Sequence, residues 1–306
     1  MELAGASVVP LLTSAWIRRA SESVFAVLFP SDCRICGAPL ARISRLPVCD
    51  ACLEHMVPVG GRLCTVCGER VLSPYAVGAD NDPLVCPICR RMQPPFATAA
   101  AYGSYDSGLR ELIHLLKYYG VRPAANVLGR MLAEAISRLE PVRLAPEGSG
   151  GDRIVVIPVP LHKTKLRQRG FNQAELIARA ALKCISRERF CLADSVLQRQ
   201  RDTRSQIGLT SHQRRENMRG AFAVTRTEEV NGRDVLLVDD VYTTGTTVSE
   251  CARVLRRAGA NRVRVATVAR TLKMASQYAE MKSPGAPASE ESGEAQEVTL
   301  ARAAGG

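Results

Sequence analysis

The sequence has few aromatic residues and no long apolar run. Aromatic residues make up 5% of its 306 residues, so a surface on which nucleic-acid bases stack is not evident. No segment reaches the roughly 18 consecutive apolar residues that a membrane-spanning helix needs, and we therefore expect no membrane span. The nearest candidates for base stacking are Tyr102, Tyr105, Tyr118 and Tyr119.

The N-terminal segment lacks the charge order of a secretory signal. The stretch from Leu3 to Ile17 is free of charge, but Glu2 precedes it and the arginines follow it, whereas a secretory signal begins with basic residues. We expect residues 1–30 to form an amphipathic helical segment that packs on the next domain, and the protein to be cytoplasmic.

Positive charge is in excess, with a formal net charge of +11. Eight cysteine thiolates holding two Zn²⁺ ions would lower this to roughly +7. From Arg153 to Lys273 there are 24 Lys and Arg residues against 11 Asp and Glu residues, so the excess lies in the second half. This balance fits either a solvated Arg-rich surface or a face that binds an anion, such as nucleic acid or a phosphorylated substrate.

Composition divides the rest of the chain into three parts. Residues 31–95 contain eight of the 11 cysteines and too few aliphatic residues for a core of their own. Residues 96–275 alternate apolar strand-like runs with segments of helical periodicity. Residues 276–306 have a composition that buries too little apolar surface to order itself, and we predict a disordered tail there.

The eight N-terminal cysteines form four CxxC pairs. A CxxC turn places two sulfur atoms on one side of a tetrahedral Zn²⁺ ion. The first pair is separated from the second by 12 residues, and the third from the fourth by 18. Without a secretory signal or a βαβ context, structural disulfides and redox-active dithiols are less favoured. We predict two structural Zn²⁺ ions in a double zinc ribbon, paired sequentially, with a crossed pairing left open. The ligands would be Cys33, Cys36, Cys49, Cys52, Cys64, Cys67, Cys86 and Cys89.

The remaining cysteines, Cys184, Cys191 and Cys251, lie on segments with apolar periodicity. They are expected to be buried thiols and not reactive ones.

Strand-like and helix-like segments alternate in residues 96–275. The runs 153–160, 234–240 and 262–270 predict strands, and the runs 171–185 and 248–260 predict helices, the first with Asn172 as its N-cap and the second ending at Gly259. This succession predicts an α/β fold whose mostly parallel sheet carries helices on both faces.

The segment VLLVDDVYTTGTT, residues 235–247, combines an apolar strand, two acids and a Thr/Gly loop. Successive backbone N–H groups at a helix N-terminus bind phosphate well, and a glycine lets the backbone approach closely. Asp239 and Asp240 would repel a bare phosphate, but they suit the hydroxyls of a ribose 5-phosphate. Pyrophosphate on carbon 1 would add a bridging Mg²⁺ ion. A bare Ca²⁺ or Mg²⁺ carboxylate pair leaves the threonines unexplained.

This segment resembles the phosphoribosyl-pyrophosphate signature of type I phosphoribosyltransferases. With GLRELIHLLKYYG (108–120), PVPLHKTKLRQRGFNQAELIA (158–178) and RRENMRGAF (214–222), the sequence resembles the ComF family (competence protein F and its relatives), in which a zinc ribbon precedes a phosphoribosyltransferase-like domain. One mild departure is Thr246, where Ala or Ser is frequent.

The resemblance implies a role for each matching residue. Asp239 and Asp240 would contact the ribose hydroxyls and the shell of Mg²⁺, and a basic loop with Arg169 would stabilise charge on the leaving pyrophosphate. Gln206, Arg214 and Asn217 would lie on a mobile flap, and neither His162 nor His212 is assigned a catalytic role. The 5-phosphate would be held by Thr243, Thr244, Gly245, Thr246 and Thr247, and the pyrophosphate would be met by Val159 and Pro160.

Three functions are consistent with these features. The resemblance implies a phosphoribosyltransferase that binds phosphoribosyl pyrophosphate with Mg²⁺ and acts in DNA uptake, although no segment identifies the acceptor. The alternative is a competence protein that binds single-stranded DNA, together with DNA-uptake proteins, without turnover. A regulatory protein that binds the ligand without releasing pyrophosphate is the third.

Overall fold

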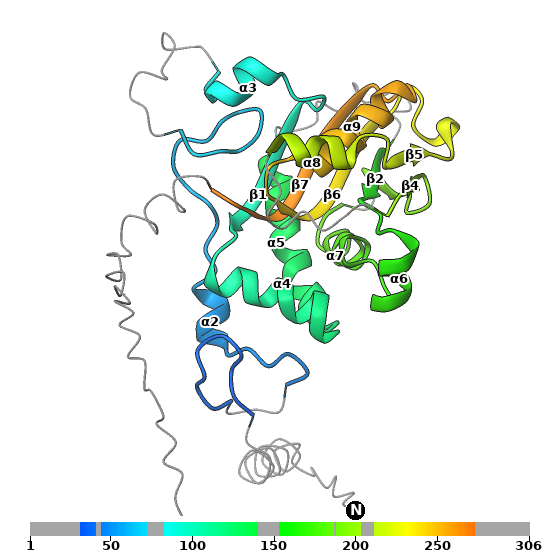
Figure 1. The fold of residues 1–306 in the computed structure, drawn as a ribbon. Coiled ribbons are helices and arrows are strands. Elements are labelled where there is room, and N and C mark those ends of the chain that lie inside the picture. The colour runs from blue at the N-terminus through cyan, green and yellow to red at the C-terminus, as the bar shows by residue number, and fades with distance from the viewer. Residues whose placement is uncertain are drawn as a thin grey trace, which may run out of the picture. The chain divides into compact units, whose positions relative to one another are not determined.

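The computed structural model in Figure 1 describes residues 31–40, 44–71, 83–139, 153–186, 188–202 and 211–272. The predictions for residues 1–30, for Gln206 and for the tail at 276–306 lie outside these ranges. Within them, no helix has the length and apolar character required to cross a membrane. The predicted boundary between the cysteine-rich and sheet regions, at residues 95 and 96, stays a prediction.

A five-stranded parallel sheet organises the chain from residue 98 onward. Its spatial order is β1-β7-β6-β2-β3, and each neighbouring pair is parallel. The predicted strand at 262–270 has the expected limits, and the strand predicted at 234–240 continues for two further residues. The strands are β1 (Thr98–Ser104), β2 (Ile154–Pro158), β3 (Phe190–Leu192), β6 (Asp234–Tyr242) and β7 (Arg262–Arg270).

Strand β2 buries both faces because every one of its side chains is apolar. In β2, Val156 packs into one core and Val155 into a second core on the opposite face. Val155 is paired with Val235 and Val156 with Leu236 in the neighbouring strand, so the register places apolar side chains together on each face. Such continuous apolar runs are typical of parallel strands covered on both sides.

Helices cover both faces of the sheet, as predicted (Figure 1). Helices α5 and α7 supply side chains to the first core, and α9 supplies them to the second. Asn172 is the N-cap of α7, because its Oδ1 accepts a hydrogen bond from the Ala174 backbone N–H at 3.1 Å. The long helices are α4 (Ser107–Tyr119), α5 (Ala124–Arg138), α7 (Gln173–Ala181), α8 (Ser211–Met218) and α9 (Thr246–Arg257).

The basic segment after β2 is a helix and not the loop we expected. Helix α6 (Lys163–Arg169) begins at His162, whose Nδ1 accepts a hydrogen bond from the Thr164 backbone N–H, and ends at Gly170 in the left-handed conformation. These two caps satisfy the ends of a short helix whose middle consists of good helix formers. His162 therefore has a structural capping role.

The remaining elements are short. Antiparallel strands β4 (Leu197–Arg199) and β5 (Phe222–Val224) form a separate pair, and the 3-10 helix η2 (Thr227–Glu229) precedes β6. In the cysteine-rich region, helices α2 (Asp50–Glu54) and α3 (Pro87–Met92) each begin directly after a cysteine.

Both halves of the cysteine-rich region pack on the sheet domain. Leu46, Val48 and Met56 join the core beside α4. In the second half, the Val66 carbonyl accepts a hydrogen bond of 2.7 Å from the backbone N–H of Ala99 in β1. The sheet thus supplies the apolar contacts that the cysteine-rich region is too small to make on its own.

The strand order creates a switch point between β2 and β6. From β2 the chain proceeds to β3 on one side, and later strands continue through β6 and β7 on the other. Loops that leave the carboxyl ends of two such strands diverge and open a crevice, which is the usual ligand site of open α/β sheets. The predicted site residues follow β2 and lie in and after the end of β6.

Candidate functional site

Asp239 and Asp240 lie near the carboxyl end of β6, beside the end of β2. Asp240 is buried and Asp239 is half-buried. Asp239 Oδ1 accepts a hydrogen bond of 2.9 Å from the Asp240 backbone N–H. The two carboxylates therefore have different surroundings although they are neighbours in the chain.

Asp240 is paired with a lysine that the sequence analysis did not single out. Lys117, near the end of α4, donates a hydrogen bond of 2.7 Å from Nζ to Asp240 Oδ1. The second oxygen, Oδ2, is buried without a hydrogen-bond partner among the described residues. A buried acceptor without a donor is unfavourable by about 1–3 kcal/mol. A hydroxyl or a hydrated cation that enters this edge would satisfy it.

The titration of this cluster reflects burial and charge together. Burial, followed by the charge of Asp240, raises the pKa of Asp239 from 3.8 to about 7. For Lys117, burial alone would lower the pKa, but the carboxylate of Asp240 outweighs it and the pKa is raised. The surroundings of Asp239 thus favour its protonated form more than water does.

The Thr/Gly segment forms the N-terminal end of α9. Gly245 is the N-cap residue with φ of 74°, and no described side chain caps this end. The first backbone N–H groups of a helix have no partner within the helix and attract anions. Thr243 and Thr244 are exposed, Thr246 and Thr247 are half-buried, and the hydroxyls of Thr244 and Thr246 are 2.8 Å apart. The predicted phosphate-binding residues are therefore grouped around one helix end.

The ring of Tyr242 lies directly under Gly245. A Cβ atom at Gly245 would be 2.2 Å from Tyr242 Oη, so the loop can approach the ring only because this residue is glycine. Tyr242 is buried, and this burial raises the pKa of its hydroxyl. Phe96 meets it edge-on, with ring centroids 6.4 Å apart.

The segment after β2 lies beside the acidic pair. The Val159 backbone N–H donates to the Val238 carbonyl at 2.8 Å, and the Val159 carbonyl accepts from Asn172 Nδ2 at 3.1 Å. Pro160 follows and is half-buried. These two hydrogen bonds join the predicted pyrophosphate loop to β6 and to Asn172, the N-cap residue of α7.

Arg169 does not contact the acidic pair in the structure. Its guanidinium donates to Gln173 Oε1 and lies 5.7 Å from the centroid of the Tyr118 ring. The other basic residues of α6 are exposed. Asn217, predicted to lie on a flap, is in α8, which precedes β5.

The four tyrosines considered as stacking residues differ in exposure. Tyr102 is buried and donates from its hydroxyl to the Met56 carbonyl at 2.6 Å. Tyr105 is half-buried and is hydrogen-bonded to His114 at 3.1 Å. Tyr118 and Tyr119, at the end of α4, are 68% and 66% exposed.

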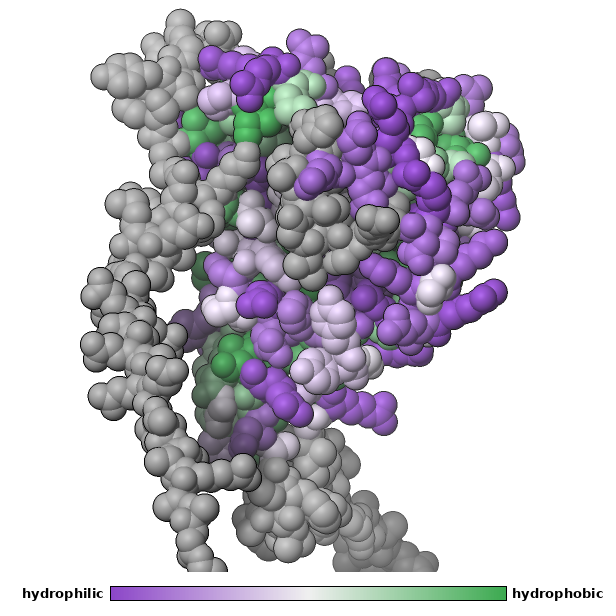
Figure 2. All heavy atoms as spheres, viewed as in Figure 1, coloured by the Kyte–Doolittle hydropathy of each residue, from purple (hydrophilic) through white to green (hydrophobic). Residues whose placement is uncertain are grey.

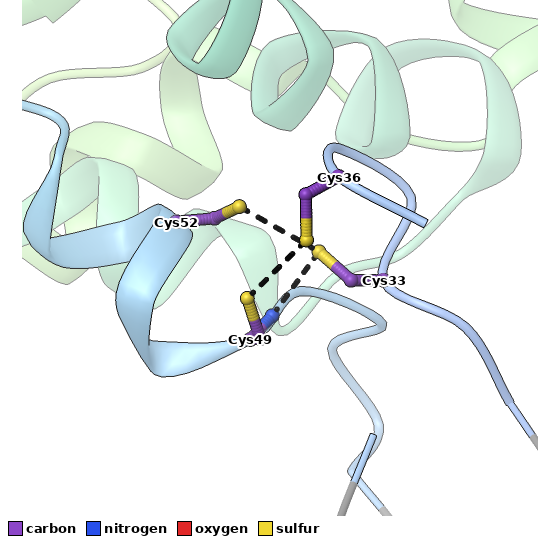
Figure 3. A group of neighbouring side chains, drawn as sticks. All are labelled: Cys33, Cys36, Cys49 and Cys52. Carbon is purple, nitrogen blue, oxygen red and sulfur yellow. Dashed lines mark hydrogen bonds between the residues drawn. The ribbon is translucent and has the colours of Figure 1, made fainter. Parts of the chain in front are cut away.

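The eight N-terminal cysteines gather into two groups of four, in the sequential pairing. Within each group the sulfur atoms all lie within 4.8 Å of one another. Figure 3 shows the sulfur atoms of the first group pointing toward one another. Cys49 is the N-cap residue of α2, and Cys52 lies within this helix. The groups are Cys33, Cys36, Cys49 and Cys52, and Cys64, Cys67, Cys86 and Cys89.

The sulfur separations fit tetrahedral zinc. Zn–S bonds of about 2.3 Å at tetrahedral angles place sulfur atoms about 3.8 Å apart, whereas a disulfide requires about 2.05 Å. The distances are 3.8 Å between Cys33 and Cys52 and 3.7 Å between Cys36 and Cys49. All 11 cysteines are free of disulfides. The donor set therefore matches the two structural zinc ions predicted from the spacing.

The prediction for the other three cysteines was partly wrong. Cys251 is fully buried, and burial raises its pKa well above the usual value, as expected of an inert thiol. Cys191 is half-buried. Cys184 is exposed and lies beyond the end of α7 at Ala181.

Two protein families match the sequence. The Double zinc ribbon domain family matches residues 24–90 and the Phosphoribosyl transferase domain family matches residues 167–284. Together with the parallel sheet, these matches identify a phosphoribosyltransferase fold preceded by a double zinc ribbon.

The chain is similar to proteins named for DNA utilization and to proteins named for competence. DNA utilization protein YhgH of Escherichia coli (strain K12) is 34% identical over 247 residues, which are 79% of this chain and 98% of that protein. Competence protein F of Haemophilus influenzae is 28% identical over 231 residues, 72% and 96% of the two chains. Competence protein ComFC of Bacillus subtilis is 25% identical over 215 residues, 69% and 79%.

Proposed function

Because the chain belongs to the ComF family, we propose that the crevice between the ends of β2 and β6 binds phosphoribosyl pyrophosphate with Mg²⁺, in a protein that acts in the uptake or use of DNA. One observation carries the proposal. Asp239 and Asp240, whose Oδ2 is buried without a partner among the described residues, lead directly into a helix end that no described side chain caps, at the switch point of the sheet. A ligand with hydroxyls at one end and phosphate at the other satisfies both parts.

The proposed contacts divide the ligand among the predicted site residues. Asp239 and Asp240 accept hydrogen bonds from the ribose hydroxyls and bind the hydration shell of Mg²⁺, for which carboxylate oxygens are suitable ligands. The 5-phosphate is held by the backbone N–H groups and hydroxyls of Thr243–Thr247. The segment at Val159 and Pro160 faces the pyrophosphate. Arg169 supplies positive charge at the rim after it leaves Gln173.

In the transferase form of this proposal, an acceptor attacks carbon 1 of the ribose. The bond from carbon 1 to the pyrophosphate oxygen breaks with its electron pair, and a bond from carbon 1 to the acceptor forms. The described residues would act by positioning the sugar and by stabilising charge on the leaving group. Bound Mg²⁺ would neutralise part of the pyrophosphate charge. Each four-cysteine cluster would hold one Zn²⁺ ion with a structural role, since four thiolates leave no open position.

Calorimetric titration of phosphoribosyl pyrophosphate, with and without Mg²⁺, tests the proposal. We expect one Mg²⁺-dependent site in the wild type and at least about a hundredfold weaker binding in the double variant Asp239→Asn, Asp240→Asn. Asp234→Asn is the control, because Asp234 is an ion-paired acid at the opposite end of the same strand. Folded, zinc-loaded wild type that binds no ligand would refute the proposal. Positive binding would justify screening acceptors for pyrophosphate release.

A second function, binding of single-stranded DNA, is favoured by the exposed rings of Tyr118 and Tyr119. Arg169 lies 5.7 Å from the centroid of the Tyr118 ring, and Arg34 lies 6.0 Å from that of Tyr119. Figure 2 shows mainly hydrophilic side chains over the neighbouring helix α6. Tyrosine faces flanked by arginines suit bases and phosphates of one strand.

Fluorescence anisotropy with a labelled oligothymidine tests this second function. Replacing Tyr118 and Tyr119 by leucine should weaken binding by at least tenfold, because each stacked base contributes about 1–3 kcal/mol. Replacement by phenylalanine keeps the rings and should leave the affinity nearly unchanged. Binding should also fall steeply with salt. If the wild type binds no oligothymidine at low salt, this function is excluded.

A further inference from the structure

Arg270 connects the second cysteine cluster with the sheet. It is the last residue of β7, and its guanidinium is buried. One nitrogen donates to the Cys67 carbonyl. A second nitrogen, Nη2, lies 3.7 Å from Cys67 Sγ and donates to Glu69 Oε2 at 2.8 Å. The side chain thus binds both a predicted zinc ligand and the acid two residues after it.

The same guanidinium lies against the ring below the phosphate loop. Its central carbon is 4.4 Å from the centroid of the Tyr242 ring. The hydroxyl of that ring lies under Gly245, too close for any side chain at that position. Tyr242 is also tied to the end of β7, because its carbonyl accepts from the Thr271 backbone N–H at 3.0 Å. Contacts therefore run without a gap from Cys67 through Arg270 and Tyr242 to Gly245.

We infer that Arg270 is a positioning residue, which holds Tyr242 under the phosphate loop and thereby couples the second cysteine cluster to the binding of a 5-phosphate. The identity of the ligand in this inference rests on the proposed function, whereas the effect of Arg270 on the order of the loop does not. The two ends of the contact chain are a cluster of four cysteines and a loop that has to present its N–H groups in one arrangement.

Attachment of the ribbon alone does not account for Arg270. The second half of the cysteine-rich region is already joined to β1 by the bond from Ala99 N–H to the Val66 carbonyl and by Thr98 Oγ1, which donates to the Thr65 carbonyl at 2.9 Å. A buried arginine and carboxylate are costly to remove from water, and an apolar pair of similar volume often serves stability equally well. The feature specific to the charged pair is the placement of a cation on the ring of Tyr242.

The test compares two ion pairs that are each made by a buried arginine of β7. The test variant is Arg270→Met with Glu69→Gln, which avoids leaving an unpaired buried carboxylate. The control is Arg264→Met with Asp234→Asn, because Arg264 pairs with Asp234 at 2.9 Å at the beginning of β7 and β6, away from the loop. Both variants lose one arginine of β7 and its acidic partner.

Hydrogen exchange of the amides in residues 242–247 measures loop order without any ligand. We expect exchange at least about tenfold faster in the Arg270 variant and unchanged in the Arg264 control. Calorimetry with ribose 5-phosphate should show about tenfold weaker binding for the Arg270 variant only. Metal analysis should still give two zinc ions per chain for both.

The outcomes separate this inference from the proposed function. Wild-type exchange in a folded Arg270 variant overturns the inference, whatever the affinity. Failure of the wild type to bind ribose 5-phosphate refutes the ligand assignment, and the exchange result then decides the role of Arg270. Should the Arg270 variant not fold, Tyr242→Leu and Tyr242→Phe take its place. Leucine removes the ring and should loosen the loop, phenylalanine should preserve its order, and equal exchange in the two overturns the inference.

Discussion

Lys117 and Asp240, which are 123 residues apart in the chain, form an ion pair with a distance of 2.7 Å from Nζ to Oδ1. Their side chains are 17% and 5% exposed, so water screens neither charge well. The pair joins the end of α4 to the end of β6 and fixes one oxygen of Asp240. The other oxygen is left for the ligand.

Removing Lys117 should destabilise the fold because Asp240 would remain buried without a counterion. We expect Lys117→Met to lower the free energy of unfolding by about 3–5 kcal/mol, measured by urea denaturation. Adding Asp240→Asn to this variant should recover part of the loss. Arg226→Met is the control, since its pair with Glu229 is exposed and should contribute less than about 1 kcal/mol. Equal stability of the single and double variants would contradict this account.

Stability should depend on pH through Asp239. Its pKa is about 7 in the folded protein against 3.8 ordinarily, so between these values the folded state holds a proton that the unfolded state has lost. Wild-type stability therefore falls as pH rises through this window, by at most about 1.4 kcal/mol per pH unit. The Asp239→Asn variant lacks this loss. Its advantage in melting temperature should grow from pH 5 to pH 7 and then level off, and a constant difference would show that Asp239 titrates normally.

Alanine at Gly245 should abolish binding of the 5-phosphate. The position has φ of 74°, and the added Cβ would lie 2.2 Å from the hydroxyl of the held Tyr242 ring, so the loop has to move. Gly232→Ala is a matched control, because φ is 72° there but no atom lies within 4 Å of the added Cβ. We expect the control to lose about 1 kcal/mol of stability and to bind normally. Similar calorimetric affinities for the two variants would show that the contact with Tyr242 is unimportant.

The two cysteine clusters should release zinc at different rates. All four cysteines of the second cluster are buried, whereas only Cys33 is buried in the first and Cys36 is exposed. A chromogenic chelator should therefore remove two zinc ions in two phases, the first cluster faster. Cys36→Ser should eliminate the fast phase, and Cys89→Ser should eliminate the slow one. A single phase, or less than about one zinc ion per chain, would contradict the assignment.

Much of the fold was predictable because each main strand corresponds to a short apolar run in the local sequence. The apolar runs that became β2, β6 and β7 are bounded by turn residues, and the cap at Asn172 marks the start of α7. The parallel order of these strands followed from the alternation with helices. The group of residues at 239–247 was predictable for the same reason, since one strand and the following helix end place all of them together.

The contacts that complete the site were not predictable, because they join distant segments. Lys117 lies in the amphipathic helix α4, and the sequence around it gives no local sign of its partner. Arg270 similarly finds Cys67 and Glu69 far earlier in the chain. The basic stretch that became α6 was expected to be a loop because the resemblance implied one there, whereas its two end caps decide its conformation.

The position of β1 at the edge of the sheet has a consequence for how the protein is made. Among the described strands β1 is synthesised first, and its neighbour in the sheet is β7, which is synthesised last. At typical rates of synthesis the interval between them is on the order of ten seconds. Until β7 is synthesised, one edge of β1 and one edge of β6 have no neighbouring strand. The sheet on which the binding site is built is therefore completed only after β7 has been synthesised.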